Sequence, residues 1–303
     1  MTDTSGTITA AGPPPQVSTA GRRDWSYLVG YLLVAPPLLV MLLLIFYPAI
    51  LAVIDTLFLH DDKTGQVSFS LQQYLGFFQD PILVANLRFT AEITAVTVGM
   101  LFVIGYPLAL YLRFTKSRLA GAVQVLTLFP LFVPGVILAF ALIQFLGSHG
   151  MLDTMLNRIG FSGYRTPYLQ PQGIVIALVW EGIPFTVLVL TAGLRQIEDA
   201  VVESARDVGA DNLQIFFRIL LPLSLRSAII VFCLNVIGVF GAFTLPYLLG
   251  PAQPMMMGVS MQQTFNNYQD RVGALAQAVI TFAICALVGL LYVRTVTRRA
   301  GRA

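Results

Sequence analysis

The sequence predicts an all-α membrane protein that crosses the bilayer six times, with both chain termini in the cytoplasm. The 303 residues are 56% hydrophobic and only 11% charged, whereas about 25% of residues are charged in a typical soluble domain. Six apolar stretches each exceed the length of about 20 residues that a helix needs to span a bilayer. The Lys and Arg residues gather in alternate loops, as they do on the cytoplasmic side of membrane proteins.

The six predicted spans differ in their charged residues. The second span contains Arg88 and Glu92, the fourth contains Glu181, and the other four contain no charged residue. Two prolines and a glycine within residues 130–135 predict a kink in the third span. The spans run approximately over residues 27–54, 86–112, 119–146, 173–194, 227–249 and 272–293.

The positive charges predict the orientation. With both termini placed in the cytoplasm, 13 of the 18 Lys and Arg residues lie on cytoplasmic segments, which is the bias expected of inner-facing loops. Residues 1–24 are rich in Thr, Ser, Gly, Ala and Pro and are predicted to form a disordered cytoplasmic tail. Residues 25–303 are predicted to form the transmembrane domain. Short helices are predicted in two outer loops, over residues 71–78 and 151–156.

Residues 195–226 are predicted to form an ordered cytoplasmic loop. Apolar residues recur at helical spacing on both sides of Gly209, which suits the left-handed position that ends many helices. Asp211 is a candidate N-cap for the next helix, and Gln214 three residues later is close to a capping box. Pro222 is predicted to end that second helix. The pattern indicates two short amphipathic helices joined by a tight turn.

The spacing within this loop resembles the EAA signature of the permeases of binding-protein-dependent ABC importers. The residues that carry the resemblance are Glu203, Ser204, Ala205, Gly209, Ile219, Leu221 and Pro222. Only Ser204 departs from the usual alanine, and a small side chain there still allows close packing. The resemblance implies the importer-permease fold, in which a cytoplasmic coupling helix inserts into a groove on a separate ATPase.

The resemblance also implies roles for individual residues. Glu203 would make polar contacts, Ala205 would allow close packing, and Gly209 would allow the sharp turn. Ile219 and Pro222 would anchor the second short helix to the bundle. The residues predicted to dock the ATPase are Glu203, Ser204, Ala205, Asp207, Gly209, Ala210, Asp211, Ile219 and Pro222.

The chain is predicted to be a transport subunit, not an enzyme. A P-loop requires a Gly-Lys pair to hold phosphates, but the two lysines, Lys63 and Lys116, follow Asp62 and Thr115. ATP and Mg are therefore expected on a partner ATPase dimer, and no cofactor or metal is expected on this chain. The resemblance implies a second permease subunit, expected to be a distinct homologue, and an extracytoplasmic solute-binding protein. It also implies the bacterial inner membrane, with no nucleic acid as a partner.

Three polar residues within the spans are candidates for the translocation path: Glu181, Glu92 and Asn235. A charge at the centre of a bilayer costs about 2.5–3.5 kcal/mol on insertion scales, so it usually faces the bundle interior or a cavity. Glu92 follows Arg88 by four residues, which leaves a structural ion pair as its alternative role. For Glu181 the alternative is pairing with the backbone or with another helix, and for Asn235 it is a contact between helices.

The run from Glu203 to Ala210 is most similar to the loops of permeases for polyamines and related amines. A cationic solute also fits a role for Glu181 and Glu92. Two alternatives stay open. The same importer class handles other solutes, such as aminophosphonates, ferric iron and sugars. A secondary transporter without an ATPase is the other, although the inverted repeat typical of many such proteins is not evident.

Overall fold

The computed structural model describes residues 26–60, 67–161 and 163–297. These residues are helical apart from one small hairpin and the connecting segments, which confirms the predicted all-α class. The described residues form two compact units, which divide between Leu51 and Ala52.

The first unit is a long apolar helical stretch. It consists of α1 (Ser26–Met41), a π-helical turn η1 (Leu42–Phe46) and the start of α2 (Tyr47–Leu57), which continues into the second unit. The stretch Gly30–Leu57 has 28 residues, and its most apolar part has no buried residue. A helix of this length and apolarity suits a lipid environment, which confirms the first predicted span. The predicted tail, residues 1–24, lies outside the described residues.

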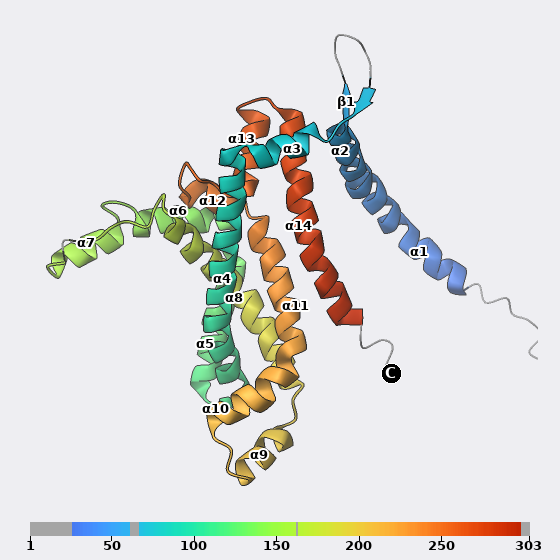
Figure 1. Ribbon diagram of the computed structural model, residues 1–303. Coiled ribbons are helices and arrows are strands. Elements are labelled where there is room, and N and C mark those ends of the chain that lie inside the picture. Colours follow the sequence, from blue (N-terminus) through green and yellow to red (C-terminus); the bar gives the residue numbers. More distant parts are fainter. Residues whose placement is uncertain (1–25, 61–66, 162, 298–303) are drawn as a thin grey trace, which may run out of the picture. The chain divides into compact units, whose positions relative to one another are not determined.

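The second unit is built on four long helices, shown in Figure 1. They are α4 (Pro81–Phe114), α8 (Pro171–Arg195), α11 (Leu221–Phe240) and α14 (Arg271–Thr297). α4 and α8 cross closely, because a Cβ atom added at Gly105 would lie 2.8 Å from the methyl carbon of Thr186. A small residue at such a crossing lets two membrane helices approach. The fully buried side chains of Leu101 and Leu190 lie along the same two helices.

Within the described residues, six helical stretches are long and apolar enough to cross a membrane. This confirms the predicted number of spans. The stretches are Gly30–Leu57, Pro81–Phe114, Gly135–Arg158, Pro171–Arg195, Asn212–Phe240 and Arg271–Thr297. Two of them differ from the predicted boundaries by more than two helical turns at both ends.

The third predicted span, residues 119–146, is wrong as a single kinked helix. The chain there forms α5 (Arg118–Leu128), a 3-10 turn η2 (Phe129–Phe132) and α6 (Gly135–Leu146). Val133 is extended, with φ −101° and ψ 113°, as the residue before a proline prefers, and Pro134 has no amide hydrogen to continue a helix. The apolar stretch of membrane length instead starts at Gly135 and includes α7 (Met151–Arg158).

The fifth predicted span, residues 227–249, is shifted. The helix begins at Asn212 and ends at Phe240, and α12 (Thr244–Leu249) follows as a separate short helix. The prediction that Pro222 ends a helix is also wrong. Pro222 lies in the first turn of α11, directly after the π-helical turn η3 (Phe216–Leu220). Proline is tolerated in a first turn because the missing amide hydrogen is not needed there.

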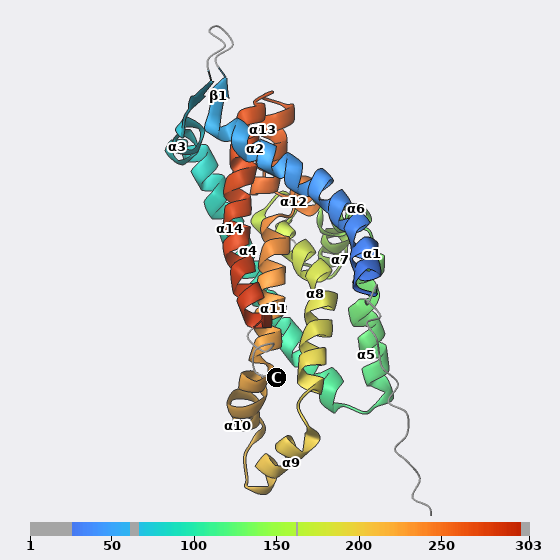
Figure 2. The same cartoon turned by 90° about the vertical axis from the view of Figure 1, so that its right-hand side faces the viewer.

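The two ends of the second unit carry different short elements. One end holds the hairpin of β1 (Phe58–His60) and β2 (Val67–Phe69), with α3 (Gln72–Gln79) and α13 (Met257–Asn266). The other end holds α9 (Asp199–Asp207) and α10 (Asn212–Ile215), and Figures 1 and 2 show this separation from two sides. The helices α3 and α7 confirm the two short helices predicted in the outer loops.

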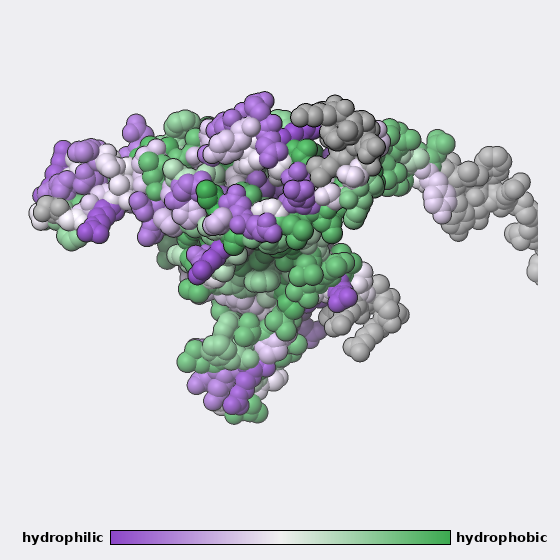
Figure 3. All heavy atoms as spheres, turned by 45° about the horizontal axis from the view of Figure 1, so that its top comes forward, coloured by the Kyte–Doolittle hydropathy of each residue, from purple (hydrophilic) through white to green (hydrophobic). Residues whose placement is uncertain are grey.

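The surface of the second unit is apolar between these ends. In Figure 3, hydrophobic residues cover the middle of the bundle, whereas hydrophilic residues gather at the tip formed by α9 and α10. The exposed side chains of Val103 on α4 and Phe282 on α14 belong to this middle zone. An apolar band between two polar ends is the surface that a bilayer requires.

Candidate functional site

The turn between α9 and α10 has the geometry of a Schellman motif. Gly209 has φ +84°, its amide donates to the Arg206 carbonyl at 2.9 Å, and the Ala210 amide donates to the Ala205 carbonyl at 3.0 Å. These two hydrogen bonds satisfy the last carbonyls of α9. The predicted left-handed glycine is therefore confirmed.

A capping box begins the second helix of the loop. The Gln214 amide donates to Asp211 Oδ1 at 2.6 Å, and the Asp211 amide donates to Gln214 Oε1 at 3.4 Å. Two backbone amides at this helix start are thereby satisfied. The predicted N-cap is confirmed, and the direction of the chain after the turn is fixed locally.

The predicted docking residues divide between an exposed and a packed group. Exposed residues are Glu203, Ser204, Asp207, Gly209, Asp211 and Pro222, whereas Ala205, Ala210 and Ile219 are half-buried. Val202 beside them is 4% exposed and packs into the apolar cluster that also contains Ile197 and Ile215. The loop therefore has one face held by the bundle and one face available to a partner.

Large apolar side chains are also exposed at the tip of the loop. Val208 is 85% exposed and Leu213 is 69% exposed. Sequence spacing placed both on apolar helix stripes, so their exposure was not predicted. Apolar side chains that gather on an exposed loop are typical of a surface that contacts another protein. No signal in the sequence distinguishes them from buried neighbours such as Val202.

The three path candidates lie on three different helices. Glu92 on α4 is paired with Arg88, with 2.8 Å between Nε and Oε1. Asn235 on α11 is buried and donates to Thr186 Oγ1 at 2.8 Å. Both observations match the structural alternatives, and within the described residues no hydrogen bond or ion pair joins the three side chains.

Glu181 lies beside the break between η2 and α6. A Cβ atom added at Gly135 would lie 3.5 Å from Glu181 Oε1, so this carboxylate faces the first residue of α6. Glu181 is itself exposed, and no ion pair involves it within the described part of the chain. Its position next to a discontinuous helix was not predicted, because the third span was expected to be continuous.

A cavity of about 490 Å³ lies at the opposite end from the docking loop, among α3, α4, α13 and α14. Asp80 and Asp270 are the charged residues among those that line it. Each uses Oδ1 to accept an amide at a helix start, from Ile82 at 2.8 Å and from Gly273 at 2.8 Å. Among the described residues, the formal charges in the wall of this cavity are therefore both negative.

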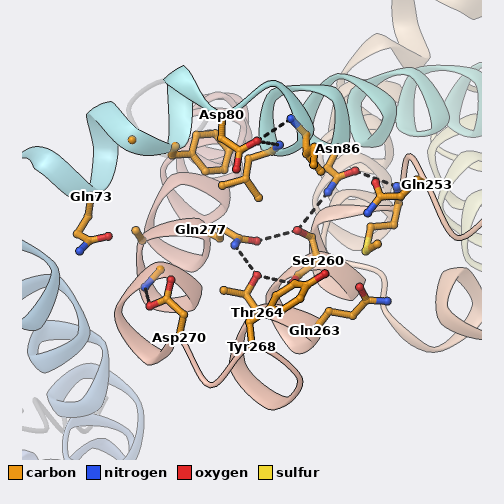
Figure 4. Close-up of a pocket in the computed structure, with 17 residues that line it drawn as sticks. Gln73, Asp80, Asn86, Gln253, Ser260, Gln263, Thr264, Tyr268, Asp270 and Gln277 are labelled. Carbon is orange, nitrogen blue, oxygen red and sulfur yellow. Dashed lines mark hydrogen bonds between the residues drawn. The ribbon is translucent and has the colours of Figure 1, made fainter.

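A chain of hydrogen bonds makes the wall of the cavity, as Figure 4 shows. Asn86 Nδ2 donates to Ser260 Oγ at 3.3 Å, which donates to Gln277 Oε1 at 2.9 Å. Gln277 Nε2 donates to Thr264 Oγ1 at 2.8 Å, and Asn86 Oδ1 accepts the Met255 amide at 2.9 Å. Buried networks with every partner satisfied are rigid. Sequence reasoning missed this cavity, because its residues come from distant segments.

Known proteins are similar to this chain over most of its length. The sequence model of the family described as "Binding-protein-dependent transport system inner membrane component" matches residues 101–302, which include the docking loop. The chain is 29% identical over 263 residues to the spermidine/putrescine transport system permease protein PotB of Escherichia coli (strain K12), covering 84% of this chain and 93% of the relative.

Other similar proteins share the fold with different solutes in their names. The sulfoquinovosyl glycerol transport system permease protein SmoG of Agrobacterium fabrum (strain C58 / ATCC 33970) is 27% identical over 281 residues, covering 89% of this chain and 90% of the relative. A chain of the bacterial alginate ABC transporter, solved in complex with an alginate pentasaccharide-bound periplasmic protein, superposes with a TM-score of 0.74 at 20% identity. That match covers 92% of this chain and 98% of the solved chain.

Proposed function

This chain belongs to the family of binding-protein-dependent transport system inner membrane components, the permease subunits of ABC importers, and we propose that it imports a polyamine or a related amine. As a multi-pass protein of the inner membrane it needs an ATPase and a binding protein as partners. In the proposal, both termini lie in the cytoplasm, ATP and Mg bind to the ATPase dimer, and a distinct homologue is the second permease subunit.

The docking loop carries the proposal that an ATPase binds at Glu203–Pro222. Its support is the turn at Gly209, which presents Glu203 and Ser204 on the exposed face of α9 while Val202 packs inward. Exposed apolar side chains at Val208 add contact area for a protein partner. Within the described residues the carboxylate of Glu203 forms no ion pair, so it is available to a partner.

Charge reversal tests the docking site. Glu203→Lys should reduce co-purification of the ATPase at least tenfold. The new ammonium group would lie in the contact, where it would be repelled or would lose its hydration. Glu198→Lys is the matched control, since Glu198 is also exposed on this loop but lies outside the motif. Full co-purification of the ATPase by Glu203→Lys, with the control also unaffected, would contradict the docking assignment.

The solute class rests on two observations. PotB, a relative at 29% identity, is by its name a spermidine/putrescine permease, and the wall of the cavity near α13 carries Asp80 and Asp270 as its charged residues. Among the described residues two carboxylates and no cation line this cavity, which favours an ammonium group over an anion. Glu181 is the remaining proposed path residue, because it lies beside the start of α6 without an ion pair in the described chain.

Uptake of labelled putrescine tests the solute. Asp80→Asn combined with Asp270→Asn removes both charges but keeps two good helix caps, so KM for putrescine should rise about tenfold or more, which is about 1.4 kcal/mol. Asp153→Asn, outside the cavity, is the control. Uptake of a neutral sugar in place of putrescine by the unaltered chain would favour the alternative solute represented by SmoG.

A further inference from the structure

Arg113 joins the long helix α4 to the docking loop. It lies in the last turn of α4. Its Nε donates to the Leu194 carbonyl at 3.3 Å, and its Nη2 donates to the Ile197 carbonyl at 2.9 Å and to Asp199 Oδ1 at 2.5 Å. A single side chain therefore contacts the end of α8, the connector after it and the first residue of α9.

These contacts hold Arg113 in one orientation. The Arg113 side chain is only 15% exposed, whereas the Asp199 side chain is 61% exposed. The last carbonyls of a helix have no partner within the helix, and a cation is favourable at that end. The guanidinium presents its donors in a fixed planar fork, so several acceptors together fix its position. The carbonyl contacts therefore matter more than the exposed ion pair, which is weakened by solvent.

Apolar contacts lie beside this polar link. Ala109 and Leu110 of α4 pack in the same cluster as Ile197 and Val202. Other cations at this end, such as Arg195 and Arg206, are exposed and form no ion pair within the described chain. The end of α4 is thus attached to the base of α9 by a half-buried guanidinium and by a small apolar contact.

The helix that Arg113 ends is continuous to the far cavity. α4 has 34 residues, which is about 51 Å at 1.5 Å per residue. Its N-cap is Asp80, and its first turns carry Asn86, so its other end forms part of the cavity wall. If a displacement of the docking loop moves the C-terminal end of α4, this one helix therefore carries the movement to the cavity wall.

We propose that Arg113 is a positioning residue that makes α4 move with the docking loop, so that nucleotide binding by the ATPase reaches the opposite end of the bundle. The inference rests on the proposed docking of an ATPase at this loop. Arg113 is not part of the proposed contact surface. Its role is separable from docking, because its guanidinium is turned towards the chain's own carbonyls.

A fluorescent thiol label on α4 measures this transmission without knowledge of the solute. Ala85→Cys places the label at an exposed position of α4, away from the residues that line the cavity. Cys285→Ala removes a competing thiol, and Cys233 is fully buried. The readouts are co-purified ATPase and the change in label fluorescence when ATP and vanadate are added to the assembled importer.

Arg113→Gln is expected to retain the ATPase within about twofold and to reduce the fluorescence change at least fivefold. Arg113→Lys keeps the charge without the planar fork, and should retain about half of the change. Arg118→Gln, an exposed cation at the start of α5, should leave both readouts unaltered. An undiminished fluorescence change in Arg113→Gln, or loss of the ATPase from it, would overturn the proposal.

The remaining outcomes of this experiment also test the positioning role of Arg113. If Arg113→Gln does not accumulate in the membrane, Arg113→Lys carries the test, and a full fluorescence change in that variant refutes the positioning role. If the unaltered chain binds no ATPase, the proposed docking function fails first and this inference fails with it. Retention of ATPase together with unchanged transmission refutes the inference alone.

Discussion

The docking end and the cavity end of the second unit are built in opposite ways. At the docking end, Gly209 and Asp211 fix a turn through hydrogen bonds between residues three to five positions apart. At the cavity end, Asn86 binds Ser260 across 174 positions of sequence. Local bonds leave the docking side chains exposed, whereas long-range bonds bury the cavity side chains. Substitutions should therefore impair partner binding at one end and stability at the other.

The largest expected effect is at Gly209. Gly209→Pro demands φ near −65° at a residue whose φ is +84°, and incompatible proline costs about 3 kcal/mol or more, so import should fall by more than about 100-fold. Membrane insertion should persist, because the turn lies outside the bundle core. Import assays with a quantified membrane fraction check this. Gly160→Pro, at another left-handed glycine with φ +85°, is the matched control, and equal loss there would remove the special role of the docking end.

The next effect is at the cavity end. Asn86→Leu leaves the buried Met255 amide without its acceptor and Ser260 without a donor, and each unsatisfied buried group costs about 1–3 kcal/mol. The thermal midpoint of the purified protein should fall by several degrees, while the ATPase still co-purifies. Gln79→Leu, an exposed amide at the same end, is the control. A normal midpoint would mean that the network is not a stabilising element.

A smaller effect is expected at the capping box. Asp211→Ala removes the acceptor of the Gln214 amide at a cost of about 1 kcal/mol, so amide hydrogen exchange should accelerate in α10. Asp211→Asn should retain protection, because asparagine is an equally good N-cap. If both variants exchange at the original rate, the start of α10 is held by packing of Ile215 and not by its cap.

The smallest effect is expected at Ser204. Its hydroxyl donates to the Ala200 carbonyl within the same helix at 2.7 Å and is exposed. Ser204→Ala restores the usual residue of the motif and should change stability by less than about 0.5 kcal/mol and import by less than twofold. A large loss of import would show that the hydroxyl itself contacts the partner, which would sharpen the description of the docking face.

Sequence patterns were reliable where a short stretch of chain controls the structure. Gly209 and Asp211 behave as expected because the left-handed turn and the capping box involve only neighbouring residues. The predictions failed at Pro134 and Pro222, where the same residue type has opposite effects. Pro134 follows an extended residue and separates two helices. Pro222 instead lies in the first turn of α11, which continues directly from the π-helical turn η3.

The sequence by itself determined the membrane class, the number of long apolar stretches and the geometry of the loop around Gly209, since composition and local hydrogen bonds decide these. Only the tertiary structure decided that Asn86, Ser260 and Gln277 form one wall, and that Arg113 reaches the carbonyls after α8. Such contacts join segments far apart in the chain, and the hydrophobic periodicity of the sequence does not show which helix faces meet. The geometry of the docking loop can therefore be predicted from the sequence, but its attachment to α4 is a property of the packed bundle.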